Sequence, residues 1–176
     1  EIYQCDWSSD VCSSDLGIPY IIHPSMLLWR LADCEIFCDK TWKAAVCHDV
    51  LEDCPHITEE QLLKEIGPEA LAIVKELTYK GKTPADKDAY LQSFGLKDES
   101  GNFLKSPHAV VIKVFDRILN TVDFLTTDRE YAKKYWKKAE HLFFAATNRK
   151  DEISSVFGPD AFARMRYTQT CVHQML

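Results

Sequence analysis

The sequence predicts an all-α fold in which a single domain is built as a bundle of helices. Apolar residues recur at helical spacing along most of the chain, as in the segment Glu69–Tyr79. Capping residues and helix breakers separate these segments. One segment, Pro107–Leu125, is apolar in nearly every direction, which is typical of a buried central helix. A length of 176 residues with 46% hydrophobic and 27% charged residues suits one domain with a sizeable core.

Residues 1–16 differ in character from the rest of the chain. They carry a duplicated S-S-D around Val11 and Cys12 and show no helical period. This stretch resembles translated sequencing-adapter sequence, and we interpret it as a non-native tail; an ordinary disordered tail is the alternative. The single domain is therefore expected to span residues 17–176.

The first two helices are expected at Ser25–Asp33 and Thr41–Asp53. Pro24 can occupy the first turn of the former, where its missing N–H costs little. His23 is thus held at a helix entrance. Thr41 is expected to act as the N-cap of the second helix, and a proline soon after its end prevents continuation.

The next helices are bounded by clear capping and breaking residues. Thr58–Gln61 fits a capping box, and Gly67-Pro68 ends that short helix and begins Glu69–Tyr79. Residues 80–107 are polar and glycine-containing, which predicts a surface excursion around one amphipathic piece, Ala85–Phe94.

The second half of the chain is expected to be helical as well. β-branched residues make a strand conceivable for Val110–Phe115, but Asp116 and Asn120 share a face only in a helix. A long helix is expected at Thr127–Thr147 and a last one at Asp160–Val172. The long helix has a lysine-rich face that is most simply solvated, with an anion site as the alternative; its lysines are Lys133, Lys134, Lys137 and Lys138.

Composition limits the kinds of partner that the protein is expected to bind and indicates the cellular compartment in which it works. A formal net charge of −6 argues against binding long nucleic acids, which favour a basic face. No apolar run approaches the length of a membrane span. Seven cysteines without a C-x-x-C pair indicate a reducing cytoplasm. Cys34 and Cys38, four residues apart, are interpreted as core residues, with a metal or redox pair as the alternative.

The stretch Ala45–Asp53, A-V-C-H-D-V-L-E-D, concentrates one imidazole and three carboxylates. Burying unpaired carboxylates costs several kcal/mol each, so this face must either turn to solvent or hold a cation. Asp116, in the helix that is expected to be buried, poses the same problem. We therefore expect His23, His48, Asp49 and Asp116 to bind one divalent metal.

Two imidazoles and two carboxylates suit Mn²⁺, Fe²⁺ or Zn²⁺ better than Ca²⁺ or Mg²⁺. A metal with an open position activates water and polarises a phosphoryl oxygen, so hydrolysis is the expected reaction. Glu52 and Asp53, one turn past the ligand pair, are placed to orient that water or transfer its proton. Asn120 is placed either to contact a substrate oxygen or to orient a metal ligand.

Four segments in this order resemble the HD-domain phosphohydrolases, and among them the (p)ppGpp hydrolase domain of the RelA/SpoT family. They are G-I-P-Y-I-I-H-P (Gly17–Pro24), C-H-D-V-L-E-D (Cys47–Asp53), T-E-E-Q-L-L-K-E-I-G-P-E (Thr58–Glu69) and V-I-K-V-F-D-R-I-L-N (Val111–Asn120). The resemblance implies an HD-domain helical bundle and removal of the 3′-pyrophosphate from guanosine tetra- or pentaphosphate. It also implies Mn²⁺ on the four ligands named above, the catalytic pair Glu52 and Asp53, and a nucleotide contact from Asn120.

The chain departs from the family pattern at its start. The family carries a basic pair before G-x-P-Y, where this chain has Ser14 and Asp15. Only about 50 residues follow Leu125, too few for a synthetase domain, so the chain resembles the small stand-alone hydrolases. The alternatives are an HD phosphohydrolase acting on another nucleotide, such as NADPH or a dNTP, and a nucleotide-binding HD module without catalysis. A structural helical bundle would leave the acidic residues unexplained.

Overall fold

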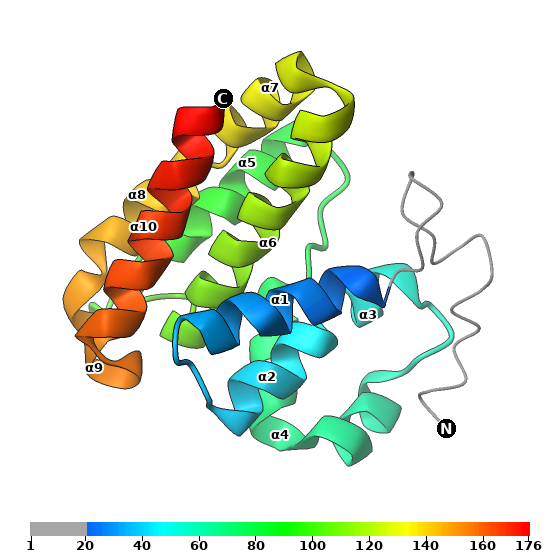
Figure 1. Cartoon of the computed structure of the whole chain (residues 1–176). Helices are drawn as coiled ribbons and strands as arrows, with labels where there is room; N and C mark the ends of the chain where they lie inside the picture. The colour runs from blue at the N-terminus through cyan, green and yellow to red at the C-terminus, as the bar shows by residue number, and fades with distance from the viewer. Residues whose placement is uncertain (1–20) are drawn as a thin grey trace.

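A computed structural model describes residues 21–176. The predicted tail 1–16, with Ser14 and Asp15, and the residues 17–20 lie outside the described part. The described residues fold into helices and contain no strand, only an isolated antiparallel bridge between Lys97 and Phe103 (Figure 1). The predicted all-α fold is therefore confirmed.

The helices form two groups with α6 between them (Figure 1). Helix α6 contacts α1, α2 and α4 from the first half of the chain and α7 to α10 from the second half. The α-helices are α1 (Ile22–Asp33), α2 (Asp39–Val46), α3 (Val50–Asp53), α4 (Glu59–Leu77), α5 (Pro84–Gln92), α6 (Pro107–Thr127), α7 (Arg129–Lys138), α8 (Glu140–Asn148), α9 (Lys150–Phe157) and α10 (Pro159–Met175). None of the helices in the described range is both long enough and apolar enough to traverse a lipid bilayer.

Helix α6 is the buried centre of the fold, as its all-round apolar pattern predicted. Ser106 caps it by accepting a hydrogen bond from the Ala109 N–H, and Pro107 occupies its first turn. Every residue from Ala109 to Leu119 is buried. Charged side chains on α6 therefore lie within the core, where they need partners.

The capping box and the glycine-proline break are confirmed. Thr58 Oγ1 accepts from the Gln61 N–H, and the Gln61 side chain accepts from the Thr58 N–H. At Gly67 the backbone has φ 80° and ψ 168°, which kinks α4 before Pro68. The helix nevertheless continues to Leu77 as one packed unit against α2 and α6.

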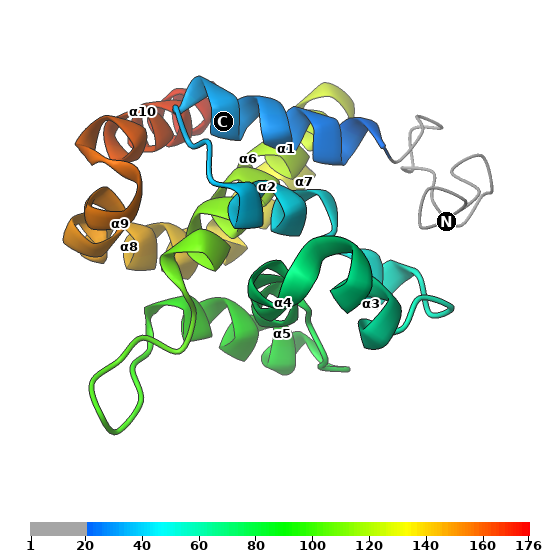
Figure 2. The same ribbon diagram turned by 90° about the horizontal axis from the view of Figure 1, so that it is seen from below.

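The excursion 80–107 contains α5 and a short 3₁₀ helix, η2 (Ser93–Gly95), followed by a protruding loop at the lower left of Figure 2. The expected piece Ala85–Phe94 is helical in α5 and η2, and Leu91 and Phe94 are its buried residues. The excursion is thus anchored to the core through buried residues near η2 and at Lys105, and it is exposed over most of its length.

Two predicted helices are wrong in their extent. The expected helix Thr41–Asp53 is interrupted: α2 ends at Val46, residues 47–49 form a turn, and α3 follows. Thr41 is a fully buried residue inside α2 rather than its cap, and its hydroxyl lies 2.7 Å from His108 Nδ1. Helix α1 begins three residues earlier than expected, so His23 lies in its first turn.

The C-terminal part also differs from the prediction. The expected helix Thr127–Thr147 is divided at Ala139 into α7 and α8. Helix α9 was not predicted, and Gly158, with φ 93°, separates it from α10. Helix α10 extends beyond the expected Asp160–Val172 at both ends.

Candidate metal centre

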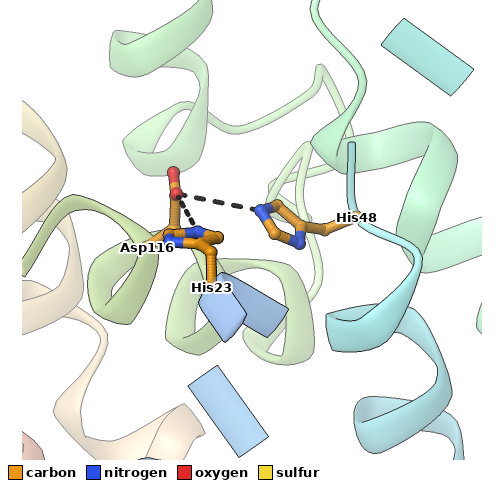
Figure 3. A group of neighbouring side chains, drawn as sticks. All are labelled: His23, His48 and Asp116. Carbon is orange, nitrogen blue, oxygen red and sulfur yellow. Dashed lines mark hydrogen bonds and ion pairs between the residues drawn. The ribbon is translucent and has the colours of Figure 1, made fainter. Parts of the chain in front are cut away.

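Three segments that are distant in sequence place His23, His48 and Asp116 together (Figure 3). His23 comes from α1, His48 from the turn between α2 and α3, and Asp116 from α6. One ligand atom of each lies within 4.8 Å of the others. His23 Nε2 is 3.2 Å from Asp116 Oδ1, and His48 Nε2 is 3.8 Å from the same oxygen.

The ring of His48 is oriented for metal binding. Its Nδ1 lies 2.8 Å from the Ala45 carbonyl oxygen. Because a carbonyl oxygen only accepts, Nδ1 carries a hydrogen, and Nε2 is the ring nitrogen that a metal can bind once its proton is displaced. Nε2 is buried and has no hydrogen-bond partner of good geometry among residues 21–176, although Asp49 Oδ2 lies 2.9 Å away. A backbone carbonyl that fixes the tautomer of a histidine is a usual companion of metal ligation.

Asp49 lies beside this group rather than within it. Its carboxylate approaches His48, and its side chain is 22% exposed, whereas that of His48 is fully buried. Its atoms do not join those of the other three within the 4.8 Å spacing. The structure thus brings three of the four predicted ligands together and leaves Asp49 at the edge.

Asp116 is the most heavily partnered residue of the site. Its Oδ1 accepts from Asn120 Nδ2 at 2.7 Å, and its Oδ2 pairs with Lys113 Nζ at 2.9 Å. Burial raises the pKa of Asp116, but the charge of Lys113 and the hydrogen bonds from the histidines outweigh burial and hold it well below the ordinary value. The carboxylate is therefore ionised inside the core.

Lys113 was missed by the sequence analysis. It lies one turn before Asp116 in the run V-I-K-V-F-D, where a lysine among apolar residues was the available signal. Its side chain is only 9% exposed. The expectation that the Asp116 carboxylate needs a partner is met here by Lys113 together with the two histidines.

The pKa of His48 is shifted strongly by its surroundings. Burial lowers the pKa of its ring, but the charge of Asp49 and then Asp116 outweigh burial and raise the pKa to about 10. The histidine therefore lies in a strongly negative environment that attracts a proton or a cation. A divalent metal that binds there must displace the proton from Nε2.

Glu52 and Asp53 lie on α3, at the exposed rim of the site. Glu52 Oε1 accepts from the Tyr79 N–H at 2.6 Å, which ties α3 to the end of α4. Partial burial and the charge of Asp49 raise the pKa of both carboxyl groups. A raised carboxyl pKa favours proton transfer near neutral pH.

Cationic and aromatic side chains lie close to the acidic group. The Arg117 guanidinium lies 4.6 Å from the centre of the Tyr135 ring. Lys87 Nζ lies 5.3 Å from the Tyr79 ring, and burial followed by the charges of Arg117 and Lys113 lowers its pKa. The sequence analysis did not single out these residues. Lys87 is close enough to Glu52 and Asp116 to feel their charges, so positive charge is available near the site for an anionic ligand.

Comparison with curated proteins gives a distant similarity. No protein-family model matches the chain. A curated protein of Spiroplasma citri, named guanosine-3′,5′-bis(diphosphate) 3′-pyrophosphohydrolase, is 29% identical over 116 residues. The aligned part covers 65% of this chain and 15% of that protein. The chain is therefore similar to a small part of a protein named as a hydrolase, and its His23, His48 and Asp116 group has the donor set of a divalent-metal site.

Proposed function

We propose that this chain is a divalent-metal-dependent phosphohydrolase of the HD type that removes the 3′-pyrophosphate from guanosine tetra- or pentaphosphate. The observation that carries the proposal is the convergence of His23, His48 and Asp116, with the Nε2 atom of His48 buried and facing the carboxylates of Asp49 and Asp116. The similarity to the Spiroplasma citri protein supports the choice of substrate. The catalytic domain is proposed to span residues 17–176, in the cytoplasm.

In this proposal His23, His48, Asp49 and Asp116 hold the metal. Their nitrogen and oxygen donors suit Mn²⁺, with Fe²⁺ and Zn²⁺ as alternatives. When bound, such a metal lowers the pKa of a coordinated water and polarises a phosphoryl oxygen. Asp49 is the most exposed of the four side chains, so it can adjust its position most easily when a metal binds.

Glu52 and Asp53 are proposed to orient the attacking water and to accept its proton. The Tyr79 N–H holds the Glu52 carboxylate in place, while burial keeps its proton affinity high. Asn120 is proposed to contact the nucleotide; its hydrogen bond to Asp116 also supports a role in orienting that ligand. The net reaction adds water across the 3′-phosphoester bond and releases GDP or GTP and pyrophosphate.

A chromatographic assay with Mn²⁺ tests the proposal. We expect ppGpp to yield GDP and pyrophosphate, and we expect Glu52→Gln to lower the rate at least about a hundredfold. Glu60→Gln, on the exposed first turn of α4, is the matched control and should keep the wild-type rate.

The same assay decides between the alternatives. Hydrolysis of NADPH or dNTPs without release of pyrophosphate from ppGpp would assign the site to another nucleotide. Nucleotide binding without any product, unchanged by Glu52→Gln, would identify a binding module instead.

A further inference from the structure

Two neighbouring cavities on the side of the molecule formed by α5, α7 and α8 share part of their lining. The first measures about 470 Å³ and the second about 330 Å³, and Gln92 and His141 line both. We call their union the α8 groove. None of the proposed metal ligands lines either cavity, although Tyr135, which lines the first, also contacts Arg117 beside the candidate metal centre. Both volumes lie within the usual range of small-molecule sites.

One half of the α8 groove is basic. Lys134, Lys137 and Lys138 on α7 line it, and all three are exposed. None of them forms an ion pair within residues 21–176, whereas the neighbouring Lys133 pairs with Glu130 at 2.9 Å. Asp88 is the one carboxylate in the lining described for this half. Three ammonium groups and one carboxylate around a concave surface leave an excess of positive charge, which favours a polyanion.

The other half of the α8 groove is apolar and aromatic. Phe144 is 68% exposed there, beside Leu96, which is 52% exposed. The Phe103 ring is already in contact with Arg149 Cζ at 4.0 Å and Lys97 Nζ at 4.6 Å. The ring of Phe144 is therefore the available surface for stacking.

Arg149 holds the apolar half of the α8 groove in a fixed shape. Its side chain is fully buried and donates to the carbonyl oxygens of Phe94 and Lys105, at 2.8 Å and 2.7 Å. It also pairs with Glu152. These bonds join both ends of the protruding loop to α8 and α9. The apolar half therefore keeps its shape without a ligand.

We propose that the α8 groove is a second binding site, and that it takes a nucleoside diphosphate or polyphosphate. The lysines of the basic half bind the phosphates, and Phe144 stacks on the base. A ligand that spans both halves needs an aromatic ring and a polyanion in one molecule, which is the chemistry of a nucleotide. Shared lining by Gln92 and His141 allows one ligand to bridge the halves.

Calorimetry with the full chain and GDP in EDTA tests this site apart from metal-dependent binding. We expect GDP to bind more tightly than guanosine or inorganic pyrophosphate, and binding to weaken as salt is added. The double variant Lys134→Ala/Lys138→Ala and the single variant Phe144→Ala should each weaken GDP binding about tenfold. Circular dichroism checks that each variant is folded.

Matched controls come from other faces of the chain. Lys64→Ala/Lys82→Ala removes two exposed lysines, and Trp29→Ala removes an aromatic side chain that is 72% exposed. These controls should keep wild-type GDP affinity. Equal GDP affinity in the groove variants and the controls would overturn the proposal. It would also be overturned if pyrophosphate bound as tightly as GDP and Phe144→Ala had no effect.

The proposal stands or falls independently of the hydrolase assignment. Hydrolysis at saturating ppGpp should stay at the wild-type level in Phe144→Ala, because this residue lies outside the metal centre. If the chain binds GDP in the α8 groove but hydrolyses nothing, only the proposed hydrolase function is contradicted. If the chain hydrolyses ppGpp but fails the calorimetric test, only the proposal of a binding site in the α8 groove is contradicted.

Discussion

At the scale of single residues, Asp116 and Lys113 decide whether the candidate site can exist in a core. Both side chains are nearly buried, and their charged atoms lie 2.9 Å apart. An isolated ion in the interior costs several kcal/mol, whereas a paired one costs much less. Each residue therefore lowers the free-energy cost of burying the charge of the other. His23 and Asn120 form hydrogen bonds with Oδ1, the other oxygen of Asp116.

Replacing Lys113 by methionine should therefore destabilise the fold through Asp116. We expect Lys113→Met to lower the free energy of unfolding by about 3–5 kcal/mol, because it leaves a buried carboxylate without its cation. Adding Asp116→Asn to that variant should recover part of the loss. Urea unfolding measures both effects. The control Lys133→Met breaks an exposed pair with Glu130 and should cost less than about 1 kcal/mol. Equal costs for Lys113→Met and Lys133→Met would contradict this account.

His108 is expected to make stability depend on pH. Its ring packs edge-on against Phe157 and lies 2.7 Å from the Thr41 hydroxyl. Burial, and then the charge of Lys40, lower its pKa below the ordinary 6.5. The unfolded chain therefore binds the proton more readily. The stabilising contribution of the neutral ring is complete above about pH 6.5 and is lost as the pH falls from there towards the pKa of the folded state.

Urea unfolding at pH 7.5 and pH 5 tests this expectation. The loss of stability between the two pH values should be smaller in His108→Gln than in the wild type. The control His56→Gln replaces an exposed histidine and should keep the wild-type loss. If the stability of His108→Gln falls between pH 7.5 and pH 5 as much as that of the wild type, His108 is not the cause of the pH dependence.

At the scale of elements, the turn between α2 and α3 aims His48 at Asp116. In an unbroken helix the Ala45 carbonyl would accept from the backbone of Asp49. Here it accepts from the ring of His48. A side chain that competes for a backbone carbonyl favours ending the helix. The turn thus directs His48 inwards while α3 presents Glu52 and Asp53 at the rim.

Local signals account for what could be predicted about the helices. Thr58 and the pair Gly67-Pro68 act through neighbouring backbone atoms, so the helix start and the kink can be predicted from the local sequence. The break at Ala139 has no such signal, because alanine favours helix. Across this break Trp136 packs on Phe143 with ring centres 4.4 Å apart, a tertiary contact that periodicity does not encode.

The same distinction applies to the site. His48 and Asp49 were recognisable by type and spacing, but the pairing of Lys113 with Asp116 depends on burial. Helix α9 was missed because it is short and has a single fully buried residue, Ile153. Burial is a property of the assembled fold, which explains why the partners of a charge are harder to predict than its presence.

The kink of α4 yields a prediction at this scale. Gly67 has φ 80° and ψ 168°, a backbone region that is essentially restricted to glycine and costs other residues about 1–3 kcal/mol. Gly67→Ala should lower the free energy of unfolding by that amount, although nothing lies within 4 Å of the added methyl group. Glu65→Ala, exposed on the same helix, should change it by less than about 0.5 kcal/mol. Chemical denaturation compares the two, and an unchanged stability of Gly67→Ala would show that the kink relaxes.

At the scale of the whole molecule, the candidate metal centre is a tertiary structure. His23 and Asp116 are 93 residues apart in sequence, and the chain must complete α1, the turn before α3 and α6 before their side chains meet. The unfolded chain has no comparable arrangement. A metal that binds here therefore binds the folded state preferentially and shifts the folding equilibrium by mass action.

Thermal unfolding in Mn²⁺ tests this linkage without any substrate. At a free Mn²⁺ concentration of 100 times the dissociation constant, the folded state should gain about 2.7 kcal/mol, and EDTA should remove the gain. His23→Gln should abolish most of it, since His23 is half-buried and its replacement is compatible with folding. His173→Gln, at the end of α10, should keep the full gain because it lies outside the metal centre. If His23→Gln and His173→Gln respond equally to Mn²⁺, the stabilisation comes from another part of the surface, and the convergence of His23, His48 and Asp116 needs a different explanation.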